Sequence, residues 1–204
     1  MIKAVLFDFD GVLTLDETGS QSICNYICQA TGVDKNLFRN EYRKYNSDLS
    51  TGKLKHEDIW GKICNEISYQ IDIKTLYDSF INTPINNKLF DLVQQLKVKK
   101  YKIGMVTDNK ADRIRSLVEF YHWHTVFDSI AVSASVGSGK DHEEIFNWIF
   151  DKLSVSPSEC VFIDNKKENL IIPKSMGVTT IFFGHNANDI TSLISELTLA
   201  EVKF

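Results

Sequence analysis

The chain has 204 residues, of which 43% are hydrophobic and 25% charged, and its formal net charge is −4. This composition is typical of a globular protein that buries a full core without disulfides or structural metals. A mildly acidic chain lacks the basic face that binds a nucleic-acid backbone, so we expect no nucleic-acid partner. No stretch approaches the ~18 apolar residues of a membrane span, so we expect no membrane partner.

The N-terminal residues do not show the basic segment, long apolar stretch and cleavage site of a secretory signal peptide, and we expect none. The cysteines are Cys24, Cys28, Cys64 and Cys160, and their spacing fits no common zinc pattern. We interpret them as reduced thiols, with Cys24 and Cys28 as small apolar residues on a buried helix face. These features predict a cytoplasmic protein.

Short apolar runs alternate with helical patterns over most of the chain. Runs of this length suit strands that are buried on both faces of a parallel sheet, and they cover residues 2–7, 103–106, 130–132, 161–163 and 181–183. Between them, apolar residues recur with the period of a helix in residues 89–96, 114–121 and 145–153. The alternation predicts an α/β fold with a doubly wound, Rossmann-like parallel sheet.

Residues 15–83 show helical patterns and no convincing strand. We expect Ser20 and Asp34 to cap the first two helices and Gly32 to end the first. Two further helices are expected around residues 59–67 and 76–80, where apolar residues recur. We therefore predict an inserted all-helical cap domain at 15–83 and a core domain made of 1–14 and 84–204.

Pro173 falls inside the helix that we expect over residues 166–176. Proline has no backbone N–H, and its ring clashes with the preceding turn of a helix. We therefore predict a kink or a late helix start at this position.

Two carboxylates follow the first predicted strand, in the segment Asp8-Phe9-Asp10-Gly11. Asp8 and Asp10 are two residues apart, so they project to one side of an extended chain. Gly11 lets the backbone turn sharply just after them. The carboxyl ends of the strands line the ligand crevice of an open α/β sheet, so this pair predicts a site where a ligand binds.

The segment DFDGVLT at residues 8–14 resembles the first motif of the haloacid dehalogenase-like phosphatases. The other motifs follow in the family's order: a strand that ends at Thr107, then Lys140 ahead of a helix, then Asp164-Asn165 after a further strand. The inserted helical region is similar to the family's helical cap. The resemblance covers nearly the whole chain and implies a phosphoric monoester hydrolase.

The resemblance also implies a role for each matching residue. Asp8 would be the nucleophile that becomes an aspartyl-phosphate, and Asp10 the general acid and base. The Thr107 hydroxyl and the Asp108 backbone N–H would hold phosphoryl oxygens, and Lys140 would offset their charge. The charges of such a site are roughly balanced, so we expect Asp10 to be held as an acid.

A Mg²⁺ cofactor is part of the same resemblance. Its protein ligands would be the Asp8 carboxylate, the Asp10 backbone carbonyl and a side chain of the pair Asp164-Asn165. The family usually has two adjacent acids where this chain has Asp164 and Asn165. An amide oxygen still coordinates Mg²⁺, so we expect weaker binding and not its loss. Either residue of the pair remains open as the direct ligand, and Asp164 is also open as the residue that orients Lys140.

We expect the substrate to be a small phosphate monoester, such as a sugar phosphate or a nucleotide, because a closing cap excludes bulky substrates. Candidates to bind a second anionic group are Arg39, Arg43, Lys44 and Lys53. The alternatives within the fold are a phosphomutase, a phosphonate hydrolase with a Schiff base on Lys53 or Lys55, and a haloalkanoate dehalogenase, against which Asp10 argues. From another class, the alternative is a non-catalytic binding module with a weakened metal site.

Overall fold

The structure, a computed structural model, describes residues 1–184 and 190–204. At its centre lies a five-stranded sheet in the order β3-β2-β1-β4-β5, in which every neighbouring pair is parallel. Its strands are β1 (Ala4–Phe7), β2 (Lys102–Thr107), β3 (Ser129–Val132), β4 (Cys160–Asp164) and β5 (Thr179–Phe182). The predicted strands and their parallel arrangement are confirmed, and β1, which carries Asp8 at its end, is the central strand.

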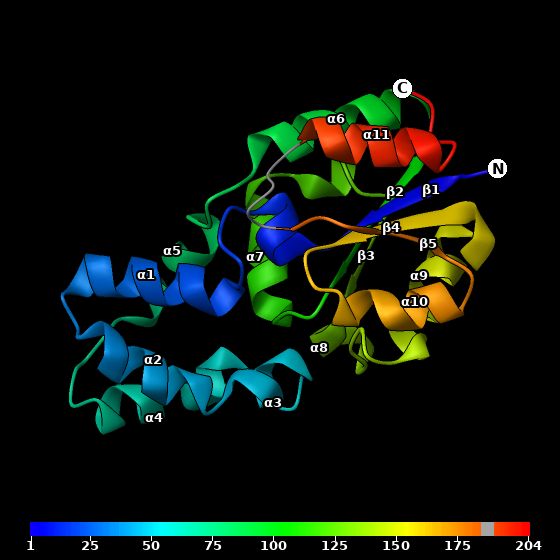
Figure 1. Cartoon of the computed structure of the whole chain (residues 1–204). Helices are drawn as coiled ribbons and strands as arrows, with labels where there is room; N and C mark the ends of the chain where they lie inside the picture. The colour runs from blue at the N-terminus through cyan, green and yellow to red at the C-terminus, as the bar shows by residue number, and fades with distance from the viewer. Residues whose placement is uncertain (185–189) are drawn as a thin grey trace.

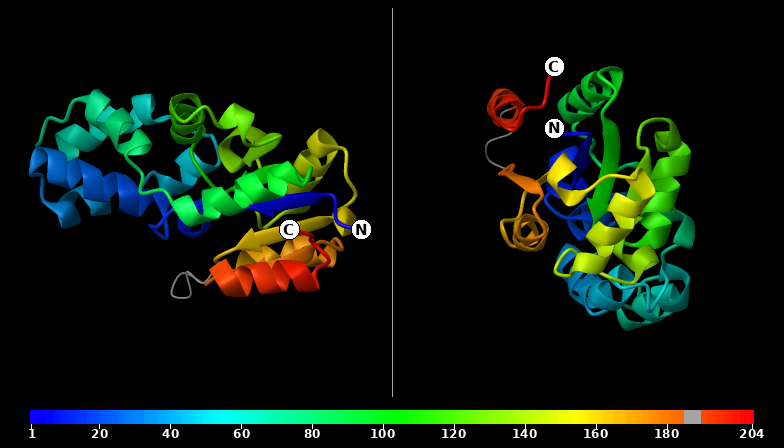
Figure 2. Two further views of the ribbon diagram at one scale, coloured as in Figure 1. Left: turned by 90° about the horizontal axis from the view of Figure 1, so that it is seen from above. Right: turned by 90° about the vertical axis from the view of Figure 1, so that its right-hand side faces the viewer.

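Helices cover both faces of the sheet (Figures 1 and 2). One face packs against α6 (Asn87–Val98), α7 (Ala111–Phe120) and α11 (Ile190–Leu199) and buries Val5 and Phe7 of β1. The other packs against α9 (Glu143–Leu153) and α10 (Ile171–Ser175) and buries Ala4 and Leu6. Successive residues of a strand point to opposite faces, so β1 is apolar at every position. This is the doubly wound arrangement that the sequence predicts.

An all-helical insertion follows β1 and lies beside the sheet, at the left in Figure 1. Its helices are α1 (Gly19–Thr31), α2 (Lys35–Arg43), α3 (Asn46–Ser50), α4 (His56–Glu66) and α5 (Ile73–Ile81). It has a hydrophobic cluster of its own, in which Ile23, Phe38 and Phe80 are fully buried. The chain enters and leaves it side by side, since Thr14 forms a β-bridge with Ile85. The helical insertion is therefore joined to the sheet by two adjacent segments.

The ends of the first two helices test the predicted caps. Gly32 ends α1 with a φ of 77°, and the Asp34 side chain accepts from the Leu37 N–H at the start of α2, as predicted. Ser20 does not cap α1. Thr18 does, by accepting from the Gln21 N–H, while the Ser20 hydroxyl donates to Asn46 at 2.9 Å. The prediction was wrong because a second capping residue lies two positions earlier.

The late helix start predicted at Pro173 is confirmed. A 3₁₀ turn (Glu168–Leu170) precedes α10, which begins only at Ile171. Pro173 therefore lies in the first turn of the helix, where a backbone N–H has no intrahelical partner to lose.

The remaining short elements are α8 (Ser133–Val136) and 3₁₀ turns at Trp123–Thr125 and Pro157–Glu159. All four cysteines are free; Cys24 is buried on α1 as predicted, whereas Cys28 is only partly buried. In residues 1–184 and 190–204, no helix combines the length and the apolar character needed to cross a membrane.

Candidate active site

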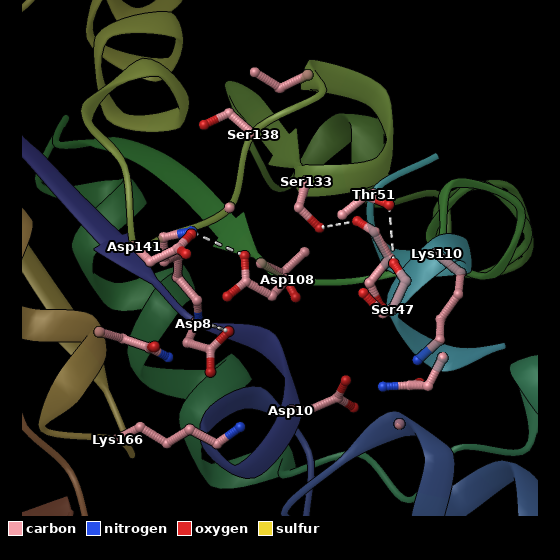
Figure 3. A pocket seen from close by; sticks show the side chains of 18 of the residues that line it. Asp8, Asp10, Ser47, Thr51, Asp108, Lys110, Ser133, Ser138, Asp141 and Lys166 are labelled. Carbon is pink, nitrogen blue, oxygen red and sulfur yellow. Dashed lines mark hydrogen bonds and ion pairs between the residues drawn. The ribbon is translucent and has the colours of Figure 1, made fainter. Parts of the chain in front are cut away.

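Asp8 and Asp10 lie where the chain turns sharply after β1. The φ and ψ angles are −74° and 119° at Asp10 and 86° and −3° at Gly11, which is a type II turn and requires a positive φ at its second central residue. Glycine also allows close packing here, because a Cβ on Gly11 would lie 2.1 Å from Nδ2 of Asn165. The turn points the two carboxylates in different directions (Figure 3) and brings the loop after β4 beside them.

Asp8, Lys140 and Asp164 form a buried charge cluster. The Lys140 ammonium lies 2.8 Å from Oδ1 of Asp8 and 2.7 Å from Oδ2 of Asp164, and none of the three residues is more than 4% exposed. Burial raises the pKa of Asp8 to about 7 although Lys140 lowers it. Burial lowers the pKa of Lys140, but the two carboxylates outweigh it and raise that pKa above its ordinary value. When all three groups are ionised the cluster carries a net charge of −1, which is costly when buried and suits a cation.

The two residues of the fourth motif differ in their contacts. Asp164 Oδ1 accepts from the Lys166 backbone N–H at 2.8 Å, and Asn169 donates to both carboxylate oxygens at 3.1 and 3.0 Å. Asn165 Oδ1 is buried and has no hydrogen-bond partner among the described residues. A buried acceptor without a donor costs free energy unless a ligand satisfies it.

The oxygen atoms of Asp8 and Asn165 suit a divalent cation that prefers oxygen ligands. Within residues 1–184 and 190–204, no three His, Cys, Asp or Glu side chains group as a metal site by themselves. A cation beside Asp8 would therefore depend on one carboxylate, the unpaired amide oxygen of Asn165, backbone carbonyl groups and water. Such a mixed oxygen set is typical of Mg²⁺ sites.

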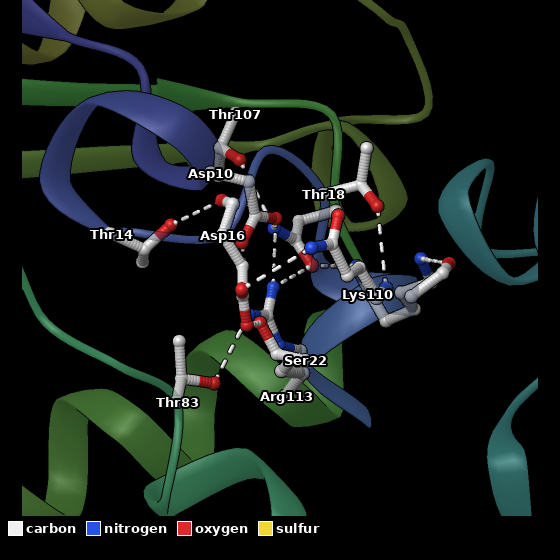
Figure 4. A network of polar contacts seen from close by, with 12 residues as sticks. Asp10, Thr14, Asp16, Thr18, Ser22, Thr83, Thr107, Lys110 and Arg113 are labelled. Atoms are coloured by element: carbon white, nitrogen blue, oxygen red, sulfur yellow. Dashed lines mark hydrogen bonds and ion pairs between the residues drawn. The ribbon is translucent and has the colours of Figure 1, made fainter. Parts of the chain in front are cut away.

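The Asp10 carboxylate belongs to a separate network (Figure 4). Arg113 donates to its two oxygens from Nη1 at 2.8 Å and from Nη2 at 2.9 Å, and Asn109 donates at 2.7 Å. Burial alone would raise the pKa of Asp10, but Arg113 and Asn109 outweigh it and hold the pKa below its ordinary value. Asp10 is therefore ionised in this conformation, whereas the expectation that charge balance keeps it protonated concerns the site with Mg²⁺ and a phosphate bound and stays a prediction.

Thr107 ends β2, Asp108 follows it, and both line the same cavity. The Thr107 hydroxyl accepts from Asn109 Nδ2 at 3.2 Å. The Asp108 carboxylate accepts from the Lys140 backbone N–H at 3.0 Å, so this side chain helps to fix the loop that carries Lys140. That contact was not predicted from the sequence.

A cavity of about 690 Å³ opens at the carboxyl ends of the strands, and we name it the strand-end cavity (Figure 3). Among the residues that line it are the predicted Asp8, Asp10, Thr107, Asp108 and Lys140. Residues of the helical insertion also line the cavity, including Ser20, Asn46 and Ser50. The structure thus brings together side chains at the ends of β1, β2, β3 and β4 and on the loop that carries Lys140, with the helical insertion as the opposite wall.

Three functional residues near the site were missed in the sequence. Asn109 directly follows Thr107-Asp108, and this neighbourhood was the one available signal for it. Lys110 and Arg113 lie at the start of α7, where charged residues usually face solvent, yet they are 5% and 0% exposed. Their burial depends on contacts with residues far away in the chain, so the local pattern gives no sign of it.

Buried polar contacts also hold the helical insertion against the sheet domain. His56 Nδ1 lies 2.6 Å from Asp112 Oδ2, and its Nε2 lies 2.7 Å from the Tyr42 hydroxyl. Burial raises the pKa of Asp112, but its bond to His56 outweighs this and the net shift is downward. A second hydrogen bond joins the helical insertion to the sheet domain, where the Ser133 hydroxyl donates to the Ser50 carbonyl at 2.7 Å.

Replacement of Arg113 by glutamine is expected to lower the free energy of unfolding by about 3 kcal/mol at neutral pH, because it leaves Asp10 buried without its cation. The folded-state pKa of Asp10 is lowered. Its ionisation therefore stabilises the native state above the unfolded pKa, and this contribution is lost as the pH falls through the folded pKa. The difference in the free energy of unfolding between wild type and Arg113→Gln should therefore decrease in acid. Urea unfolding at several pH values measures it.

The matched control is Arg115→Gln, which removes an exposed arginine from the same helix and should change stability little. If the difference in the free energy of unfolding between wild type and Arg113→Gln stayed constant with pH, the ion pair with Asp10 would be contradicted. The destabilisation would then come from lost packing alone.

Comparisons with known proteins give the family. The haloacid dehalogenase-like hydrolase family matches residues 5–183. Glyceraldehyde 3-phosphate phosphatase of Methanocaldococcus jannaschii is 24% identical over 196 residues, which is 89% of this chain and 84% of that protein. Bifunctional epoxide hydrolase 2 of Mus musculus is 30% identical over 115 residues, 53% of this chain and 20% of that protein. The chain spans only 18–46% of the length of this and several other curated relatives.

A solved structure shares the fold. A HAD family enzyme from Bacteroides thetaiotaomicron aligns with a TM-score of 0.74 at 17% identity, over 95% of this chain and 98% of that one. The same enzyme has been solved in complex with magnesium and inorganic phosphate. Because the family match extends over most of the residues, this chain belongs to the haloacid dehalogenase-like hydrolases.

Proposed function

We propose that the protein is a Mg²⁺-dependent phosphatase that hydrolyses a small phosphate monoester through an aspartyl-phosphate on Asp8. The observation that carries this proposal is the buried charge cluster of Asp8, Lys140 and Asp164, with Thr107 in the same cavity. It combines a carboxylate nucleophile with a fixed ammonium group and a net negative charge that suits a cation. The phosphatase and the magnesium–phosphate complex among the similar proteins support it.

In the first half of the reaction, a carboxylate oxygen of Asp8 attacks phosphorus. The bond between phosphorus and the ester oxygen breaks, and the leaving oxygen takes a proton from Asp10. Lys140 offsets the charge of the phosphoryl oxygens, while the Thr107 hydroxyl and the Asp108 N–H hold them in place. Asp164 keeps the Lys140 ammonium directed at Asp8.

In the second half, water attacks the phosphorus of the aspartyl-phosphate, gives its proton to Asp10 and releases phosphate and Asp8. The ionised Asp10 of this structure is in the protonation state that accepts this proton. For the first half, Asp10 must leave Arg113 and take up a proton. We infer that the contact between Asp10 and Arg113 belongs to a state between turnovers.

Asp8, the Asp10 backbone carbonyl and Asn165 would hold the Mg²⁺ ion, which supplies charge neutralisation when bound. We assign the direct contact from the fourth motif to Asn165, because its Oδ1 has no partner among the described residues, whereas Asp164 already accepts from Lys140, Lys166 and Asn169. An amide in place of a carboxylate gives a weaker site that is still suited to the ion.

The helical insertion, residues 15–83, would act as a cap over the core formed by residues 1–14 and 84–204. Its contacts with Ser133 and Asp112 support a position above the strand ends, from which it would limit the size of the substrate. Lys53 and Lys55 do not line the strand-end cavity, so no contact favours the phosphonate hydrolase. The free thiols of the four cysteines support a cytoplasmic location.

The experiment that tests this function is the release of phosphate from p-nitrophenyl phosphate as Mg²⁺ is varied. Activity should need Mg²⁺ and disappear with a chelator. Asn165→Asp should lower the half-saturating Mg²⁺ concentration several-fold, because it restores a second carboxylate to the site. Activity that survives chelation, or no release from a broad panel of phosphate monoesters, would contradict the proposal.

A further inference from the structure

A second cavity, of about 570 Å³, adjoins the strand-end cavity, and we name it the insertion cavity. The two cavities share the lining residues Glu17, Thr18, Ser20 and Asn46. The rest of the insertion cavity is formed by α1 and α2 of the helical insertion. A ligand whose phosphate lies at Asp8 can therefore extend past Ser20 into this second space.

Three cations of α2 line the insertion cavity. Lys35, Arg39 and Arg43 are spaced four residues apart, which places them on one face of the helix. Like charges at this spacing destabilise a helix unless something compensates them. In the part of the chain that the structure describes, none of the three forms an ion pair. Glu17 is the one acidic residue among the described residues that line this cavity.

A fourth cation, Lys110, lies among the residues that line the strand-end cavity (Figure 3). It lines the strand-end cavity, is only 5% exposed, and contacts Ser20, a residue shared by both cavities, at 3.4 Å. Burial lowers the pKa of Lys110 to about 8, with Arg113 contributing. The one hydrogen bond of this ammonium group among the described residues is the long contact to the Ser20 hydroxyl, and the charges of Asp10 and Asp112 offset only part of the cost of its burial.

The charges of three of these cations act on one residue of α1, Cys24. Burial raises the pKa of the Cys24 thiol to about 12, while Arg39, Lys110 and Lys35 all act to lower it. Cys24 lines the insertion cavity, as does Asn25, whose buried Oδ1 has no hydrogen-bond partner among the described residues. The region thus combines three exposed cations that have no ion pair among the described residues with an unsatisfied acceptor that suits a ligand hydroxyl.

We propose that Lys110, Lys35, Arg39 and Arg43 form a subsite for a second anionic group of the substrate. This inference rests on the proposed function and narrows it: the substrate is a small phosphate monoester that carries a second phosphate or a carboxylate, away from the phosphate that is hydrolysed. Two of the cations predicted from the sequence to bind a second anionic group, Lys44 and Lys53, do not belong to this subsite. Lys44 pairs with Glu41, and neither lysine lines either cavity.

The test uses substrates in matched pairs that differ by one anionic group. Fructose 1,6-bisphosphate is compared with fructose 6-phosphate for a second phosphate, and 3-phosphoglycerate with glycerol 3-phosphate for a carboxylate. In at least one pair the wild-type protein should have a kcat/KM about tenfold or more higher for the member with the added anion. The double variant Arg39→Gln/Arg43→Gln should bring that ratio close to one. Arg115→Gln, which removes an exposed arginine that lines neither cavity, should leave it unchanged.

Binding separates a failure of the subsite from a failure of the proposed function. Calorimetry on the Asp8→Asn protein should show tighter binding of the same anionic member, and Arg39→Gln/Arg43→Gln in that background should remove the difference. Equal affinities within both pairs would overturn the subsite even if phosphate release is robust. A clear difference in affinity without any turnover by the wild-type protein would support the subsite and overturn the phosphatase.

Discussion

Replacement of Asp8 by asparagine is expected to lower turnover of a phosphate monoester at least ~10³-fold, because the amide oxygen is a poor nucleophile toward phosphorus. Asparagine has nearly the same shape as aspartate, and Lys140 keeps its 2.7 Å contact with Asp164. The variant should therefore fold normally, with a circular dichroism spectrum like that of the wild type. Initial rates of phosphate release at saturating Mg²⁺ give the measurement.

The control for this variant is Asp91→Asn, which neutralises an exposed carboxylate on α6 that lines neither cavity. It should keep the wild-type rate. If Asp8→Asn retained more than about a tenth of the wild-type rate, Asp8 would lose its place as the nucleophile.

Replacement of Lys140 by methionine has the second large effect, on both activity and stability. It leaves Asp8 and Asp164 buried beside each other without their shared cation, which should lower the free energy of unfolding by about 3 kcal/mol at pH 8. Burial already raises the folded-state pKa of Asp8 to about 7, and loss of the ammonium group raises it further. The variant is then least stable at high pH and regains stability as the pH falls and Asp8 takes up a proton.

Urea unfolding at a series of pH values measures this effect in the absence of Mg²⁺. Lys88→Met, which removes an exposed lysine from α6, should show the wild-type profile. A Lys140→Met protein as stable as the wild type at every pH would show that the charge cluster does not control the site.

The sheet could be predicted from the sequence because its strands are short continuous apolar runs. Residues such as Val5 and Phe7 face one layer of helices while Ala4 and Leu6 face the other, and burial on both faces leaves a pattern that the chain itself displays. The position of the main site followed from the same reasoning, since the carboxyl ends of parallel strands converge at one edge. Lys140 was harder to place, and only the order of the motifs indicated it.

What could not be predicted depends on contacts between distant segments. Arg113 reads as an ordinary charged residue of an amphipathic helix, yet it is fully buried against Asp10, which lies 103 positions earlier. Thr18 and Ser20 are equally good caps by type, and tertiary contacts decided between them, because Ser20 bonds to Asn46 instead.

The sequence also could not distinguish the contacts of Asp164 from those of Asn165. Their residue types allow either one to contact a cation. The hydrogen bonds that occupy both oxygens of Asp164, and the lack of a partner for Asn165 Oδ1 among the described residues, separate the two only once the fold is known. Whether a side chain has all its hydrogen bonds depends on the packed molecule, and this difference is the basis for proposing Asn165 as the metal ligand.

The central claim is that a phosphoryl group is carried covalently by Asp8. The most direct measurement is an acid quench during turnover, followed by proteolysis and mass spectrometry of the peptide that contains Asp8. The account predicts a peptide heavier by one phosphoryl group, with the modification on Asp8, and no such species from Asp8→Asn. A phosphoryl group found on another residue during turnover, or rapid phosphate release by the Asp8→Asn protein, would contradict it.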